Sequence, residues 1–184
     1  MHRCVGTNEP IEVSFDLEMY QTAVERGDEM GRLRQSFTKG QSNRWGFLGE
    51  ELVSVWVDGK ITNDYQYDVL TPLGTKLEVK TKKTTRLKPP LPHYESSVCD
   101  FNATQKCDAY VFVRVCTMFE QTNNPEHMKA WICGWVSKKE FQHRAKMFKK
   151  GDLDERNNYR VHADCWNIAI GDLHEVPSFD KEYI

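Results

Sequence analysis

The chain has 184 residues, of which 39% are hydrophobic and 28% charged, and its formal net charge at pH 7 is −2. This size and composition suit one domain with an ordinary apolar core, and the near-neutral balance gives no overall signal for nucleic acid or a membrane. No apolar stretch approaches the roughly 20 residues of a membrane-spanning helix, so no such span is expected.

Six cysteines are scattered along the chain without a C-x-x-C pair, and we expect no signal peptide at its start. These features predict a cytoplasmic protein with reduced thiols. His162 with Cys165, or His93 with Cys99, would supply half of a zinc site, but the other two ligands are missing in each case.

Residues 1–42 are predicted to form an N-terminal arm and helix ahead of the main domain. Ile11–Phe15 alternates apolar and polar residues, as a strand or extended arm does. Leu17–Phe37 is helix-rich in composition, and Gly27 and Gly31 are the expected breaks in it.

Residues 43–184 are predicted to form the main domain, which opens with a helix from about Asn43 to Val57. Asp58-Gly59 is expected to end this helix, since glycine adopts the left-handed conformation of a helix end. The apolar residues of the helix share one broad face and are Trp45, Leu48, Leu52, Val55 and Trp56.

Two short runs then predict a hairpin, because Thr71-Pro72-Leu73-Gly74 joins Tyr65–Leu70 to Leu77–Thr81. A proline-rich loop over Arg86–Pro92 and a short helix over Asn102–Asp108 are expected next.

The remaining elements are mostly strands. Strands are predicted over Ala109–Cys116, Ala130–Val136, Tyr159–His162 and Trp166–Ile170, with a turn over Gln121–Pro125 and a helix over Lys138–Phe148 capped by Ser137. The order of elements predicts an α/β (α+β) fold in which helices flank a mixed central β-sheet completed by the last strands.

The tripeptide Glu78-Val79-Lys80 is the candidate centre of chemistry. In a strand, residues two apart project from one face, so Glu78 and Lys80 point together and Val79 packs on the other face. The tripeptide alone is weak evidence, since Asp58-Gly59-Lys60 fits the same bare pattern, although at a helix end.

Asp68 strengthens the case because it lies ten residues before Glu78, on the other arm of the predicted hairpin. Two carboxylates held side by side repel each other unless a cation lies between them. Oxygen ligands with room for water and phosphate favour Mg²⁺, with Mn²⁺ as a substitute. Lys80 would then orient a metal-bound water or neutralise charge on the reacting phosphate.

Together with an upstream segment, these residues resemble the PD-(D/E)XK nuclease family. Gly46-Phe47-Leu48-Gly49-Glu50 is similar to the G-x-x-G-E element of the first core helix in many members, with Glu51 as a rival to Glu50. The resemblance covers about Asn43–Val115 and implies a restriction-endonuclease-like core. No proline precedes Asp68, although one is common in the family.

The family pattern also implies site residues. A Gln or Lys often follows on the next helix, and Gln105 and Lys106 fall in that place. The implied catalytic residues are Glu50, Asp68, Glu78, Lys80 and Gln105. The implied magnesium ligands are Asp68, Glu78, the Val79 carbonyl and Glu50.

A locally basic segment follows the candidate site. Between Lys76 and Lys88 there are six basic residues against one acidic residue, Glu78. Such a segment suits non-specific contact with the phosphates of a duplex, and the alternative is a solvated flexible loop without a ligand. The predicted DNA-binding residues are Lys82, Lys83, Arg86, Lys88 and Lys106.

The resemblance implies a magnesium-dependent endonuclease that hydrolyses double-stranded or branched DNA, either site-specific in the manner of homing and restriction enzymes or junction-resolving. A homodimer is expected, since specific duplex cutting usually joins two active sites. Trp131–Glu140 and the strands after it resemble the tail of phage-encoded members, which implies the host cytoplasm. The alternatives are a non-catalytic nucleic-acid-binding module on the same fold and a related RNA-cleaving enzyme.

Overall fold

A computed structural model of the chain describes residues 8–30 and 43–176. Its centre is a six-stranded sheet in the order β1-β7-β6-β4-β3-β2. These strands are β1 (Ile11–Ser14), β2 (Lys60–Asp64), β3 (Tyr67–Leu70), β4 (Lys76–Thr84), β6 (Ala109–Cys116) and β7 (Lys129–Ser137).

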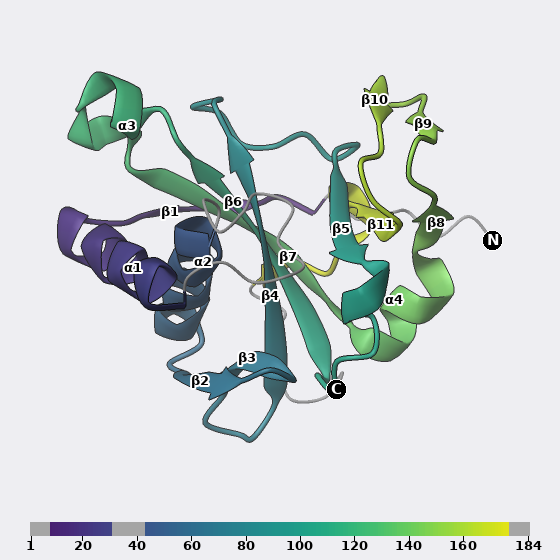
Figure 1. Cartoon of the computed structure of the whole chain (residues 1–184), viewed down its shortest axis with the longest axis horizontal. Helices are drawn as coiled ribbons and strands as arrows, with labels where there is room; N and C mark the ends of the chain where they lie inside the picture. Colours follow the sequence, from purple (N-terminus) through teal and green to yellow (C-terminus); the bar gives the residue numbers. More distant parts are fainter. Residues whose placement is uncertain (1–7, 31–42, 177–184) are drawn as a thin grey trace.

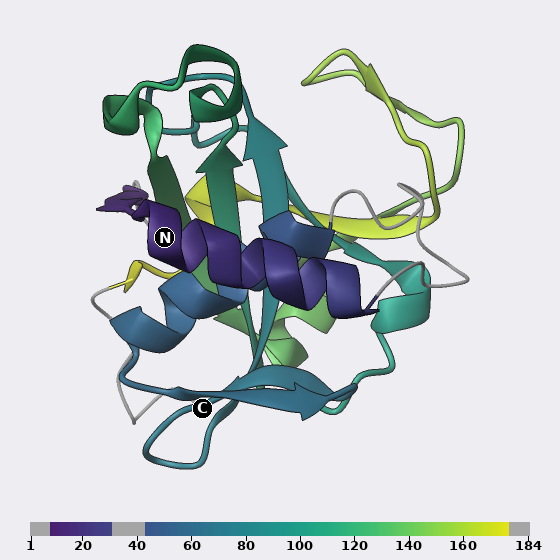
Figure 2. The same cartoon turned by 60° about the vertical axis from the view of Figure 1, so that its left-hand side comes forward.

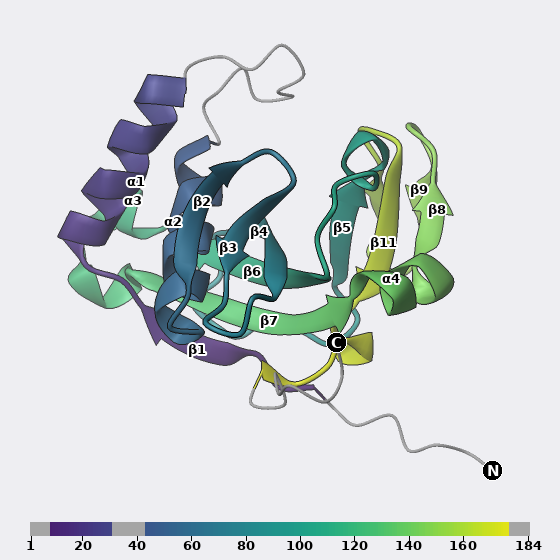
Figure 3. The ribbon, with the colours of Figure 1, turned by 90° about the horizontal axis from the view of Figure 1, so that it is seen from below.

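Helices cover one face of this sheet and a second, smaller sheet covers the other (Figures 1 and 3). The helices on the first face are α1 (Leu17–Met30) and α2 (Asn43–Trp56), and α1 lies outermost, over α2 (Figure 2). The smaller sheet has the order β5-β11-β8 and consists of β5 (Glu95–Cys99), β11 (Cys165–Ala169) and β8 (Lys146–Phe148). The fold is thus mixed α/β with flanking helices, as the element order predicts.

Short elements complete the described chain. They are α3 (Phe119–Thr122), α4 (Lys138–Arg144), the ribbon of β9 (Leu153–Asp154) with β10 (Tyr159–Arg160), and 3₁₀ helices at Asp100–Asn102, Pro125–His127 and Ile170–Asp172. Among residues 8–30 and 43–176, no helix has both the length and the apolarity to cross a bilayer.

The pairing of β4 with β6 is parallel, whereas the other strand pairings within the main sheet of the described chain are antiparallel. A parallel pair needs a crossover connection, and here residues 85–108 form it, with β5 and the first 3₁₀ helix inside it. The crossover therefore carries one strand of the smaller sheet across the face of β4.

Strand alternation divides the core into two layers. On β6, Val111, Val113 and Val115 pack with the helices, whereas Tyr110 and Phe112 pack with the smaller sheet. A strand buried on both faces needs apolar residues at successive positions, which explains the unbroken run Ala109–Val113.

Helix α2 approaches β4 closely at Gly49. A Cβ atom at this position would lie 2.0 Å from Thr81 Oγ1 and 3.2 Å from Thr81 Cβ, so a side chain there would overlap the strand. Glycine at position 49 therefore lets the helix rest on β4, and Glu50 follows it directly.

Several predicted boundaries in the N-terminal half are corrected. Helix α1 runs through Gly27, where a Cβ atom would lie 3.1 Å from the Arg44 backbone nitrogen, so this glycine serves helix packing and not a break. Val55 is 68% exposed and does not belong to the buried face of α2. Residues 1–7 and 31–42, with the predicted break at Gly31, lie outside the described residues.

The predicted helix over Asn102–Asp108 is wrong. The chain makes a 3₁₀ turn at Asp100–Asn102, and Gln105 N donates to Asn102 O at 3.1 Å. Bonds to the third residue back belong to tight turns, whereas an α-helix bonds to the fourth. Gln105 thus lies on a turn.

The predicted helix over Lys138–Phe148 is too long. Ser137 caps it as predicted by accepting a bond from Glu140 N at 3.2 Å, but the backbone becomes extended at Ala145. Lys146–Phe148 then forms β8, because it pairs with Cys165–Asn167.

The last strands and three other elements also differ from expectation. The predicted strands Tyr159–His162 and Trp166–Ile170 form the β9–β10 ribbon and the smaller sheet and do not extend the main sheet. Strands β2 and β5 and helix α3 lie in segments where no strand or helix was predicted.

The glycine contact predicts opposite effects for two substitutions in one helix. Gly49→Ala is expected to lower the free energy of unfolding by about 1–3 kcal/mol, because the stiff Thr81 side chain must shift. Gly46→Ala has open space around its Cβ and is expected to raise stability by up to about 1 kcal/mol through helix propensity. Urea unfolding of both variants measures the difference, and equal effects would contradict the contact.

Candidate active site

The β3–β4 pair brings Asp68 next to the Glu78-Val79-Lys80 strand. The register pairs Leu70 with Lys76 and Val69 with Leu77, so the next step places Asp68 opposite Glu78. Asp68 Oδ2 accepts a hydrogen bond from Val79 N at 2.7 Å. The N–H and C=O groups of one strand residue point to the same side, so the Val79 carbonyl also points toward β3.

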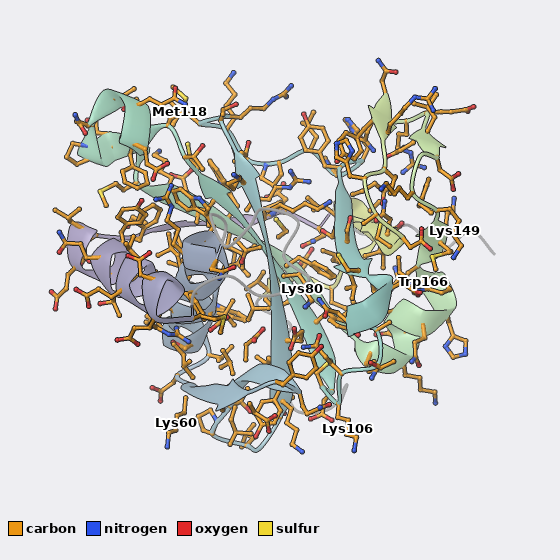
Figure 4. The ribbon with its side chains drawn as sticks, in the orientation of Figure 1. Lys60, Lys80, Lys106, Met118, Lys149 and Trp166 are labelled. Atoms are coloured by element: carbon orange, nitrogen blue, oxygen red, sulfur yellow. The ribbon has the colours of Figure 1, made fainter. Side chains whose placement is uncertain are left out.

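Glu78 and Lys80 share the face of β4 that looks toward the smaller sheet. Lys80 Nζ lies 2.5 Å from Glu78 Oε1, and Figure 4 shows Lys80 on the side of β4 that faces β5. Glu78 is only 3% exposed, and its Oε2 atom is buried without a hydrogen-bond partner among the described residues. Burial raises the pKa of Glu78 to about 7, against the opposing effect of Lys80.

Gln105 reaches the same place from the turn before β6. It is buried, its Oε1 lies 3.4 Å from Lys80 Nζ, and its Nε2 donates to the Tyr65 carbonyl at 2.8 Å. Lys138 also donates to the Gln105 carbonyl. The contacts with Tyr65 and Lys138 therefore hold the turn in position, and the Gln105 amide lies beside the Lys80 ammonium.

Glu50 contributes a third carboxylate from α2. Burial and then the Asp68 carboxylate raise the pKa of Glu50 to about 8, and Glu78 adds to the effect. Burial likewise raises the pKa of Asp68, against its bond from Val79. Glu50, Asp68 and Glu78 are thus close enough to influence one another, which is what favours Glu50 over Glu51.

Arg26 is a site residue that the sequence analysis missed. Its guanidinium bonds Glu50 at 2.9 Å and Glu51 at 3.1 Å, and it lies 4.3 Å from the centre of the Phe47 ring. The available signal was that Arg26 is the one basic residue in α1, whose other charged residues are acidic.

The carboxylate oxygens of this site suit a hard divalent cation, but in the structure they contact the side-chain cations of Lys80 and Arg26. Within residues 8–30 and 43–176, no three His, Cys, Asp or Glu side chains already form a group that could hold a metal ion. Lys80 and Arg26 compensate two of the carboxylates instead. Still, Glu78 Oε2 has no hydrogen-bond partner among the described residues and burial raises the pKa values of all three acids, so a bound cation would stabilise their charged forms.

The five predicted DNA-binding residues divide into two groups. Lys83, Arg86, Lys88 and Lys106 are exposed, and Lys106 lies by the β3 end of the site, where its backbone N–H bonds the Gln66 side chain at 3.0 Å. Lys82 is instead turned inward, and its Nζ donates to Glu95 O at 2.8 Å and Ser97 Oγ at 2.7 Å.

Comparison with known proteins adds no family assignment: no protein-family model matches the chain, and no curated protein matches it.

The raised pKa values predict that metal-free stability falls as pH rises from about 5 to 8. The folded protein keeps Glu78 protonated up to about pH 7 and Glu50 up to about pH 8, whereas the unfolded chain releases both protons near the ordinary value of 4.5. Their stabilising contribution is therefore complete below 4.5 and is lost as pH rises through the folded values.

Urea unfolding across this pH range, in chelator, measures the effect. Glu50→Gln and Glu78→Gln should each flatten the decline, because each removes one ionisation. Glu51→Gln, a substitution at the neighbouring position of the same helix, should retain it. A wild-type stability that rises over this range would contradict the assignment.

Proposed function

We propose that the chain is a magnesium-dependent deoxyribonuclease, an endonuclease of the restriction-endonuclease-like PD-(D/E)XK type. The observation that carries the proposal is the meeting of three carboxylates, one buried and two partly buried, with Lys80 where β3 and β4 part. They are Glu50, Asp68 and Glu78, and they come from three different elements. Carboxylates crowded in this way are typical of sites that hold a divalent cation.

In this proposal Asp68, Glu78 and the Val79 carbonyl hold Mg²⁺ or Mn²⁺, and Glu50 assists. The bound cation would polarise the scissile phosphate and acidify a water. Lys80 Nζ would orient the attacking water and neutralise charge that develops on the phosphate. Gln105 would hold the Lys80 ammonium in position, since its Oε1 lies 3.4 Å away.

The choice of DNA rests on the sequence resemblance and on the exposed basic residues. Lys83, Arg86 and Lys88 are solvent-exposed at the end of β4 and in the loop after it, where they would contact backbone phosphates. We further propose a homodimer, which would cut both strands of a duplex, and a reducing cytoplasm, in which the free thiols would stay reduced.

A non-catalytic DNA-binding module is the second candidate, and one observation favours it. Glu78 and Glu50 are already paired with Lys80 and Arg26, so two of the three carboxylates have cationic partners without a metal. Titration calorimetry separates the two candidates: the nuclease binds Mg²⁺ or Mn²⁺ and loses that binding in Glu78→Ala, whereas the module binds DNA but neither ion.

If the chain is a nuclease, two variants should lose most of the DNA-cleaving activity. Glu78→Ala and Lys80→Ala should each slow magnesium-dependent cleavage of supercoiled plasmid by about 100-fold or more, because each removes a group that acts on the reacting phosphate. Lys60→Ala is the matched control, since Lys60 belongs to the Asp58-Gly59-Lys60 copy of the pattern and is exposed on β2.

The products distinguish the reaction types. Nicked or linear plasmid indicates an endonuclease, loss from linear ends alone an exonuclease, and a parallel digest of RNA tests the alternative substrate. Wild-type cleavage by Glu78→Ala would show the proposed site to be wrong.

A further inference from the structure

A groove runs from Lys80 along β4, between the main sheet and the smaller sheet. It begins as a recess of about 240 Å³ lined by Lys80, Ser96 and Phe112 among others. It widens into a cavity of about 780 Å³ that reaches the β9–β10 ribbon. Lys82, Ser97, Cys99 and Arg114 line both parts, so the two are continuous.

Two neighbouring cations form the floor of this groove. Lys82 and Arg114 are register partners on the parallel strands β4 and β6, so their side chains leave the sheet on the same face. Lys82 donates to Glu95 O and Ser97 Oγ, and Arg114 donates to Glu95 O at 3.1 Å. These acceptors are all uncharged.

Among the described residues neither cation of the floor forms an ion pair, although the Glu95 and Asp154 carboxylates also line the wider part of the groove. Burial and then Arg114 lower the pKa of Lys82 to about 8, while burial and then Asp154 raise the pKa of the nearby Glu95. Like charges opposite each other on a sheet are unfavourable, so an anion bound between them would relieve the repulsion.

Aromatic rings and a further cation form the rim. The Tyr94 ring contacts two guanidinium groups, with its centre 5.6 Å from Arg86 Cζ and 5.3 Å from Arg114 Cζ. Tyr159 also lines the cavity, is half exposed, and packs edge-on against His162, with the ring centres 5.3 Å apart. Exposed aromatic faces are what proteins use to stack unpaired bases, and Tyr159 offers such a face, whereas Tyr94 is partly buried and already contacts both guanidinium groups.

The dimensions fit one or two nucleotides. A volume of about 780 Å³ lies within the usual range of small-ligand pockets and is too small for a duplex. Lys80 and Lys82 are two residues apart on one face of β4, hence about 7 Å apart, which is close to the step between successive phosphates of a strand. A phosphate at Lys82 would thus be the neighbour of one at Lys80.

We propose that this groove binds an unpaired nucleotide next to the scissile phosphate, with its phosphate on Lys82 and Arg114 and its base against Tyr159. The inference rests on the proposed function, because it takes the scissile phosphate to lie at Lys80. The enzyme then acts at junctions between paired and unpaired DNA, such as overhangs and flaps.

Binding is tested first, in chelator, so that cleavage plays no part. The full chain is titrated into fluorescein-labelled oligothymidine of about eight nucleotides, oligouridine of the same length, or a blunt duplex, and anisotropy is read. We expect tighter binding of a single strand than of the duplex. Tyr159→Ala and Arg86→Ala should each weaken it by about 5- to 100-fold.

Leu73→Ala and Lys60→Ala are the matched controls, since both residues are exposed and outside the groove. Lys82→Met tests the floor directly, with circular dichroism to confirm folding because Lys82 also holds β5. Equal binding by wild type and both rim variants, or no single-strand binding at all, overturns the proposal. The two oligomers show whether the nucleotide is DNA or RNA.

Cleavage is tested second, with a flapped and a blunt duplex of the same sequence in Mg²⁺. We expect faster cleavage of the flapped duplex, with the preference lost in Tyr159→Ala but kept in Leu73→Ala. If plasmid nicking depends on Glu78 but Tyr159→Ala keeps the flap preference, the groove does not bind the unpaired nucleotide, and the proposed nuclease function is retained. If nothing is cleaved but the rim variants lose single-strand binding, the nuclease fails and the groove stands.

Discussion

The two faces of β4 have opposite character, and the rest of the structure depends on that difference. Leu77 and Val79 lie under the helices in the apolar layer, whereas Glu78, Lys80 and Lys82 point toward the smaller sheet. A central strand is normally apolar on both faces when both are covered. Here the second face is covered and charged, so each of its ions needs a specific partner.

Those partners come from elements that are distant in the sequence. Lys80 pairs with Glu78 within the strand, and Arg26 of α1 pairs with Glu50. Lys82 donates hydrogen bonds to one carbonyl and one hydroxyl of β5. Burial outweighs these partners and keeps the pKa values of the three acids raised, and Glu78 Oε2 has no hydrogen-bond partner among the described residues. Such residual imbalance costs stability and is common at functional sites, where a ligand supplies the missing charge.

The sequence was informative where local rules decide the structure. Strand alternation predicts that Glu78 and Lys80 share a face, and the length of the hairpin places Asp68 opposite Glu78, since both rules involve neighbours in one or two strands. The resemblance singled out Gly49 and Glu50, and the packing against Thr81 supplies the physical reason for the glycine.

The misses arise where tertiary contacts decide. Glu95–Cys99 has little strand character of its own and is a strand because it pairs with β11. Lys82 belongs to a basic run that predicts exposure, and only the smaller sheet turns it inward. Arg26 stands out as the basic residue of an acidic helix, but nothing local identifies Glu50 as its partner, since the contact bridges two helices.

The geometry of the acidic site and the lining of the groove are determined by different parts of the chain. The spacing of Asp68, Glu78 and Lys80 is fixed by strand register, which tolerates no insertion. The loop over residues 85–94, by contrast, carries Arg86 and Tyr94 to the groove without taking part in the main sheet. Loop length and composition can therefore vary in descendants of this chain, or in engineered versions of it, and change what the groove accepts while the three acids and the lysine keep their geometry.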